Sequence, residues 1–190
     1  GADDVDGFLR DLVERDRREL AERLQRASSR LVELGSLLPR TPAPAAAGGD
    51  PAAEEAWSAH QVLAHIAVLS KFYGMLTYKI GSGQMEEVDL LAQVRMRDLA
   101  GGQMAERGDE ELIALATADH RRTIDFLRSA DAAAMMRTSD LGGRRMSAQD
   151  IARVALCCHL EAHLDQLQER LPPRARPGAA PISRERLAAP

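Results

Sequence analysis

His159 and His163, four residues apart in the stretch from Cys158 to Leu164, are the residues whose types and spacing are best suited to chemistry. The stretch is typical of a helix, in which side chains four apart lie on one face with Cβ atoms about 5–6 Å apart. Two neutral imidazoles so placed can bind one metal ion. Two ligands alone hold a divalent ion weakly, so a metal site here needs a third.

We predict His65 as the third ligand, because it lies in the apolar, helix-like stretch Val62–Ala67. If the two helices are neighbours, their facing sides can share one ion, and three imidazoles with an open position are typical of a reactive metal site. The alternative is that these are core histidines, each hydrogen-bonded to a backbone carbonyl or placed at the rim. The setting favours a site, since the helix that carries His159 and His163 is apolar on most sides: Ile151, Val154, Leu156, Leu160, Leu164 and Leu167.

The two remaining histidines are weaker candidates. His60 falls in the first turn of its helix, where side chains are usually solvated. His120 falls on an apolar helix face with Ile124 and Leu127. It is either a core histidine bonded to a carbonyl or water, which we favour, or a fourth ligand, an acid–base group or a substrate contact in the same cavity.

Several neighbours of the histidines have interpretable positions. Gln166 shares a face with His159 and follows His163 by three, so it either hydrogen-bonds an imidazole or is a solvated side chain. Glu161 points away from the ligand face by helix geometry. Cys157 and Cys158 are expected to pack as small hydrophobic residues. We expect the lone Trp57 to pack at the start of its helix.

The positioning elements are predicted to be four main helices in one domain spanning residues 1–171. Leucine periodicity and capping boxes at Ser58–Gln61 and Ser147–Asp150 define them, and Asp109 is a plausible N-cap. Phe8 to Val13 is either a separate turn or a loosely packed extension of the first helix. A short helix broken at Gly101–Gly102 and an irregular loop around Gly142–Gly143 are also expected. The ranges are 8–38, 58–80, 109–130 and 147–171 for the main helices, 88–99 for the short helix, 40–53 for a mobile connector, and 172–190 for a disordered tail.

Composition narrows the class of protein. The chain has 190 residues, of which 45% are hydrophobic and only 3% aromatic, so an aliphatic, helix-forming core is expected. The 25 basic and 29 acidic residues are interspersed without a basic block, which argues against nucleic acid or a membrane as partner. No apolar run reaches the roughly 20 residues of a membrane span. The two cysteines are adjacent and no secretory signal is evident, so a cytoplasmic location is expected.

Two motifs resemble the DinB-like family of mycothiol- or bacillithiol-dependent metalloenzymes. Trp57–Ile66 is similar to the start of that family's second helix, where a Trp-Ser/Thr cap leads to a metal-binding histidine. His159–Leu167 is similar to its closing HxxxH helix, followed by Gln-Leu. The resemblance implies an all-α, antiparallel four-helix bundle, a site of His65, His159 and His163 for a divalent ion, most often zinc or nickel, and frequent homodimers.

The resemblance also implies an activity. Members of known activity are S-transferases or isomerases that use mycothiol, bacillithiol or glutathione, or metal-dependent hydrolases. The Arg- and Ala-rich composition, with only two lysines, suggests a high-GC bacterial source, which favours mycothiol or bacillithiol. We therefore expect a metal-dependent transferase that joins a small-molecule thiol to an electrophile. The alternatives are a metal-dependent hydrolase of the same fold and a non-enzymatic metal- or ligand-binding stress protein.

Overall fold

The computed structural model describes residues 1–39 and 54–178, and in this part of the chain the protein is mostly helical. The predicted connector at 40–53 lies outside the described residues. The elements are α1 (Ala2–Ser36), η1 (Glu54–Ala56), α2 (Ala59–Gly81), β1 (Glu87–Val88), α3 (Leu90–Ala105), α4 (Asp109–Ser129), α5 (Ala132–Met136), β2 (Thr138–Leu141), β3 (Arg144–Ser147), α6 (Ala148–Asp150), the π-helical η2 (Ile151–Cys158), α7 (His159–Glu169) and η3 (Pro173–Ala175).

The core lies between α1, α2, α4 and the consecutive segments η2 and α7. Both α1 and α2 pack against α4, and both pack against η2 and α7. The core is aliphatic, as composition predicted, and leucines such as Leu24, Leu63 and Leu156 are fully buried in it. Burial of an aliphatic side chain contributes about 1.5–3 kcal/mol, so this packing holds α2 against α7.

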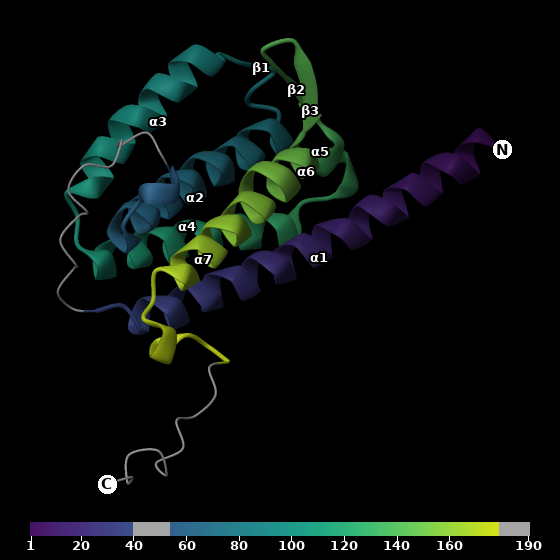
Figure 1. Ribbon diagram of the computed structural model, residues 1–190. Helices are drawn as coiled ribbons and strands as arrows, with labels where there is room; N and C mark the ends of the chain where they lie inside the picture. The colour runs from purple at the N-terminus through teal and green to yellow at the C-terminus, as the bar shows by residue number, and fades with distance from the viewer. Residues whose placement is uncertain (40–53, 179–190) are drawn as a thin grey trace, which may run out of the picture.

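The first helix is one continuous helix from Ala2 to Ser36, so the separate turn considered for Phe8–Val13 is wrong. Its first turns extend past the rest of the protein (Figure 1), and Val5 and Phe8 are more than half exposed. These residues therefore form the loosely packed extension that was the other alternative. The helix ends before Pro39, which cannot continue it.

Both predicted capping boxes are present. The Ser58 hydroxyl accepts from the Gln61 backbone N–H, and the Gln61 side chain accepts from the Ser58 N–H. Ser147 and Asp150 make the same reciprocal pair at the start of α6. The prediction for Asp109 is wrong, since Gly108 holds the cap position and Asp109 is the first helical residue.

The region between α2 and α4 differs from its prediction. The helix α3 continues through Gly101–Gly102 to Ala105. Its described side chains are all exposed or only partly buried. It packs on α2, on the far side from α1 (Figure 1). Two glycines weaken a helix by about 1 kcal/mol each without having to end it.

The expected loop at 138–145 is instead a β-hairpin. Strands β2 and β3 pair antiparallel, with Thr138 opposite Ser147, and β1 pairs parallel with β2. Gly142 and Gly143 form the turn with φ of 62° and 87°, which favours glycine at both positions. The strands are short and polar, so the usual alternation of hydrophobic residues is missing from the sequence.

The last long segment begins with α6, passes through the π-helical η2 and ends in α7. The π-helical turns were not predicted and lie immediately before His159. The segment is not buried on every side, because Val154 is 56% exposed. Within the predicted tail, η3 forms one 3-10 turn, and residues 179–190 lie outside the described part of the chain.

Candidate metal centre

The three predicted ligands, His65, His159 and His163, lie together at the contact between α2 and α7. His65 follows the Ser58 cap by two turns of α2, while His159 and His163 occupy the first two turns of α7. One ligand nitrogen from each residue can be chosen so that all three lie within 4.8 Å of one another. Among the residues that the structure describes, these form the only such group of metal-ligating side chains.

The spacing of the nitrogens fits a single small cation. The Nε2 atoms of His65 and His159 lie 3.3 Å apart. Two ligands at 2.0–2.1 Å from a tetrahedral ion are separated by about 3.3 Å. The His163 ring lies close to both others, with centroid distances of 4.5 Å to His65 and 4.8 Å to His159. Imidazole nitrogens suit zinc, nickel, copper or iron, so the residues fit a divalent metal.

Hydrogen bonds at Nδ1 orient two of the rings. The Nδ1 of His159 lies 3.2 Å from the Ala155 carbonyl, and that of His163 lies 2.8 Å from Oε1 of Gln166. Both partners are oxygen acceptors, so each Nδ1 carries the proton and each Nε2 keeps its lone pair. Of the two alternatives for Gln166, the hydrogen bond to an imidazole is therefore the correct one. Gln166 is itself held by a bond from its Nε2 to the Glu54 carbonyl at 2.6 Å.

Burial keeps two of the imidazoles, those of His65 and His159, neutral. It lowers the pKa of His65 to about 3, with a further contribution from the neighbouring His163, His159 and Arg97. Burial also lowers the pKa of His159, and again the charges of His163 and Arg97 act in the same direction. A neutral imidazole is the form that ligates a metal. At neutral pH these two rings need not lose a proton in order to bind a metal ion.

Trp57 covers one side of the group. Its ring lies 5.0 Å from that of His65 and 6.1 Å from that of His163, and the latter pair is nearly parallel. The residue packs against the hydrophobic core immediately before the Ser58 cap, as predicted. Its carbonyl also accepts a bond from Arg170 at 2.7 Å. An indole in this position excludes water from one side of the site and leaves the other sides accessible.

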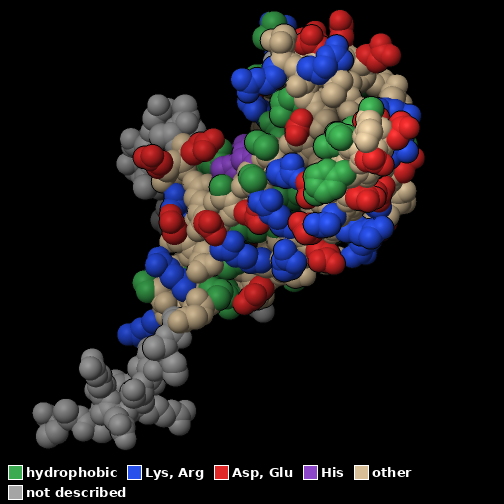
Figure 2. Space-filling model, turned by 90° about the vertical axis from the view of Figure 1, so that its right-hand side faces the viewer, with side chains coloured by type: hydrophobic (Ala, Val, Ile, Leu, Met, Phe, Trp, Pro, Cys, Tyr) green, Lys and Arg blue, Asp and Glu red, His purple; other side chains and the backbone are tan. Residues whose placement is uncertain are grey.

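Two cavities adjoin the histidines. One, of about 430 Å³, is lined by His159, His163 and Gln166 together with Glu54, Glu55, Ala162, Glu169 and Arg170. The other, of about 350 Å³, is lined by His65 and Trp57 with residues of α2 and α3 that include Arg97 and Asp98. Figure 2 shows histidine side chains in a recess of the surface with acidic side chains beside it. A small molecule can therefore reach the group from outside.

His120 does not belong to the three-histidine group. It is buried, with Nε2 2.7 Å from the Ser70 hydroxyl and Nδ1 2.9 Å from the Ser28 hydroxyl. Both ring nitrogens are thus used in the core, and burial lowers the pKa of His120 to about 4. The favoured interpretation as a core histidine is confirmed, with hydroxyls in place of a carbonyl or water as its partners.

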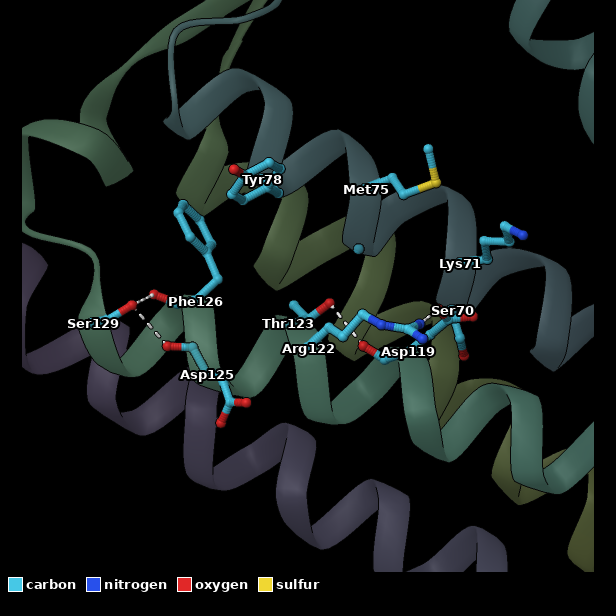
Figure 3. Close-up of a pocket in the computed structure, with 11 residues that line it drawn as sticks. Ser70, Lys71, Met75, Tyr78, Asp119, Arg122, Thr123, Asp125, Phe126 and Ser129 are labelled. Carbon is cyan, nitrogen blue, oxygen red and sulfur yellow. Dashed lines mark hydrogen bonds and ion pairs between the residues drawn. The ribbon is translucent and has the colours of Figure 1, made fainter.

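Ser70 connects His120 to a separate cavity of about 410 Å³ between α2 and α4 (Figure 3). Tyr78 and Phe126 lie at one end of this cavity and the Asp119–Arg122 ion pair at the other. Its α2 residue Gly74 follows His65 by nine positions, which places it about 180° around the helix. The cavity is therefore on the opposite face of α2 from the metal-ligating group.

His60 is not the solvated side chain that was expected. Its Nδ1 lies 2.7 Å from Asp109 and its Nε2 lies 2.7 Å from the Ala105 carbonyl. It therefore joins the start of α2 to the junction of α3 and α4. The sequence contains no spacing that indicates this contact, because the partners lie 49 and 45 residues away.

The predictions for the remaining neighbours are confirmed for Glu161 and Cys157 but not for Cys158. Glu161 points away from the site, as predicted, and pairs with Arg23 of α1. Cys157 is buried, as predicted, and burial raises its pKa to about 12. Cys158 is instead exposed, and its sulfur accepts from Arg23 at 3.2 Å, so the prediction that it packs as a hydrophobic residue is wrong.

Sequence reasoning missed Glu54 and Arg97. Both line the cavities beside the histidines, but one precedes the capping box of α2 and the other belongs to a separate helix. A single charged residue in a charge-rich sequence carries no signal of its own, and only the packing of α3 on α2 brings Arg97 near the site.

Comparisons with models of protein families, with curated proteins and with solved structures found no match. In the described residues, none of the helices has the length and apolar character needed to cross a membrane.

Proposed function

We propose that His65, His159 and His163 hold one divalent metal ion and that the protein is a metal-dependent enzyme acting on a small molecule. The observation that carries the proposal is the convergence of three imidazoles, with an Nε2–Nε2 separation of 3.3 Å between His65 and His159. Three protein ligands leave a coordination position open, which is the arrangement of catalytic rather than structural sites.

The protein residues around the site have separate tasks in this proposal. A bound divalent ion lowers the pKa of a thiol or a water molecule in its open position and so supplies a nucleophile at neutral pH. Gln166 and the Ala155 carbonyl fix two rings with Nε2 toward the ion. Trp57 excludes water on one side. The two adjoining cavities provide room for the reacting molecules.

The reaction that we propose first is transfer of a low-molecular-weight thiol. The thiol loses its proton to solvent water, its sulfur forms a bond to an electrophilic carbon, and the leaving group departs with the electron pair of the broken bond. The support for this reaction is the likeness of the Trp57–Ile66 and His159–Leu167 motifs to DinB-like proteins. The same likeness supports an antiparallel four-helix bundle, zinc or nickel as the metal, mycothiol or bacillithiol as the thiol, and a homodimer as proposals.

A second candidate, metal-dependent hydrolysis, is favoured by a separate observation. Glu54 and Glu55 line the cavity that contains His159 and His163, and the charge of Glu54 acts on His159. A carboxylate in this position can serve as general base toward a water molecule. The attack of water would then cleave an ester or amide bond, with the proton passing from Glu54 to the leaving group.

The two reactions can be separated with one set of proteins. We would load the protein with zinc or nickel and measure the consumption of bacillithiol or mycothiol, with monobromobimane as the electrophile. Hydrolysis of p-nitrophenyl acetate would be measured separately. Thiol transfer predicts metal-dependent thiol consumption that is lost in His163→Ala and retained in Glu54→Gln. Hydrolysis without thiol transfer, lost in Glu54→Gln, would favour the second candidate. A loaded protein inactive in both assays would support the non-enzymatic alternative.

A further inference from the structure

Arg97 occupies an unusual place for a charged residue, on the face of α3 that packs toward α2. Four residues at steps of three and four along this face are partly buried: Gln93, Arg97, Gly101 and Met104. The apolar residues Leu91, Val94, Met96 and Leu99 are instead exposed. The inward face of α3 thus carries a guanidinium at its centre, where an aliphatic residue would gain more by burial.

The charge of Arg97 reaches the three-histidine group. Arg97 shares the 350 Å³ cavity with His65 and Trp57. Its charge is near enough to oppose protonation of both His65 and His159, and its side chain is 38% exposed, so a ligand in the cavity can reach it. A cavity of this volume is within the range of about 300–1,000 Å³ that holds small-molecule ligands.

The guanidinium of Arg97 has no close partner in the part of the chain that the structure describes. Its ion pair there is with Asp98, at 3.6 Å and therefore beyond hydrogen-bond distance, and the Asp98 side chain is 69% exposed. Arg170, on the other side of the site, differs because it donates to the Trp57 and Glu55 carbonyls at 2.7 Å. Arg170 is thus used in the fold, whereas the donors of Arg97 are available to a ligand.

The two sides of the site differ in charge. Three carboxylates, those of Glu54, Glu55 and Glu169, line the cavity next to His159 and His163 against the single cation of Arg170. On the α3 side the cation of Arg97 faces only one carboxylate, that of Asp98. An anionic group is therefore repelled less on the α3 side. A guanidinium matches the two oxygens of a carboxylate with two parallel hydrogen bonds, which makes a carboxylate the natural ligand of a free arginine.

We infer that the cavity between α2 and α3 binds the carboxylate of a small-molecule substrate, and that Arg97 recognises it. The reacting end of that molecule lies at the three histidines, and this part of the inference rests on the proposed function. The carboxylate contact rests on Arg97 and its cavity alone. The substrate class is accordingly a small carboxylic acid, such as a carboxylate-bearing thiol.

A pair of matched probes tests the inference: 3-mercaptopropionate and its neutral methyl ester. The protein is loaded with cobalt(II), and probe affinity is read from the sulfur-to-cobalt absorption band. We expect the wild type to prefer the carboxylate by about tenfold, the difference that a charged hydrogen-bonded pair makes. Arg97→Gln should remove the preference, Arg97→Lys should keep part of it, and Arg95→Gln, an exposed change on the same helix, should leave it intact.

A second measurement needs no metal. The Arg97 Nε–Hε resonance, identified by its loss in Arg97→Lys, should shift when 3-mercaptopropionate is added to the metal-free protein and should not shift with the ester. An unmoved resonance, or equal preference for the carboxylate in wild type and Arg97→Gln, would overturn the inference. A cobalt-loaded protein that binds neither probe through its sulfur would contradict the proposed function. The Arg97 resonance would still decide whether the carboxylate contact exists.

Discussion

The Nε2 atoms of His65 and His159 lie 3.3 Å apart although the residues are 94 positions apart in the chain. Packing rather than local geometry sets this distance. Buried residues on both sides of the pair, among them Ile66 and Leu160, are fully enclosed in the core. A core packed at this density resists displacement of the two helices, so the nitrogens are held together before any ligand binds.

The first prediction concerns Gln166, which accepts a bond from His163 at 2.8 Å. Replacing it with alanine frees the His163 ring to rotate and to change tautomer. We expect metal affinity to fall by about 10–100-fold, as for other partners of ligating histidines. A zinc competition titration measures this. Gln168→Ala is the matched control, because Gln168 lies on the same helix and bonds Arg30 instead of an imidazole. Equal affinities for the two variants would contradict the role of Gln166.

The second prediction uses the single tryptophan of the chain as a reporter. The Trp57 ring lies 5.0 Å from that of His65, so an open-shell ion held by the histidines is close enough to quench its fluorescence. Titration with nickel(II) or cobalt(II) should quench the emission with saturation at one ion per chain. His159→Ala should show little quenching at the same concentrations. Identical curves for the variant and the wild type would place the ion elsewhere.

The third prediction is a pH dependence of stability to which His120 contributes, alongside His65 and His159, whose pKa values burial also lowers. Burial lowers the pKa of His120 to about 4, whereas an unfolded chain binds this proton near the ordinary value of about 6.5. Between these values the unfolded state holds more protons than the folded state. The free energy of unfolding therefore falls as the pH falls through this window, by up to about 1.4 kcal/mol per pH unit for one histidine.

Urea unfolding of the metal-free protein at pH 7, 5.5 and 4.5 measures this slope. His120→Gln retains hydrogen-bonding groups near Ser70 and Ser28 but cannot titrate. Its unfolding should therefore take up about one proton fewer in this pH window, and its stability should depend less on pH. The same slope for variant and wild type would show that His120 does not contribute to the pH dependence.

The fourth prediction concerns the close approach of α2 and α4 at Gly74. A Cβ at this position would lie 2.5 Å from Oγ1 of Thr123. Gly74→Ala should therefore lower the free energy of unfolding by about 1–3 kcal/mol. In a Thr123→Ala background the obstructing oxygen is gone, and the better helix propensity of alanine, about 1 kcal/mol, should reverse the sign. Urea unfolding of the four proteins tests this, and equal destabilisation in both backgrounds would refute it.

The sequence predicted the three-histidine group and the main helices because most of their signals are local. The capping boxes of Ser58 and Ser147 and the leucine periodicity mark helices from short windows, and HxxxH places two imidazoles on one face. The hairpin at 138–147 was not predicted, because its strands, Thr138–Leu141 and Arg144–Ser147, are short and polar. Their burial depends on how the rest of the chain packs.

The features of the site that sequence reasoning missed depend on long-range packing. Arg97 reaches the histidines only through the contact of α3 with α2, and Glu54 only through the position of η1 beside α7. The partners of His120, Ser28 and Ser70, come from two other helices. No spacing along the chain encodes these contacts, so they had to come from the three-dimensional arrangement.

The metal content of the purified protein tests the central claim most directly. After loading with zinc or nickel and removal of excess ion, elemental analysis should find one ion per chain in the wild type and in His60→Gln, whose histidine lies outside the group. His159→Ala and His163→Ala should each retain well under one ion per chain. Metal content unchanged in both of these variants, or no metal in the wild type, would contradict the three-histidine site.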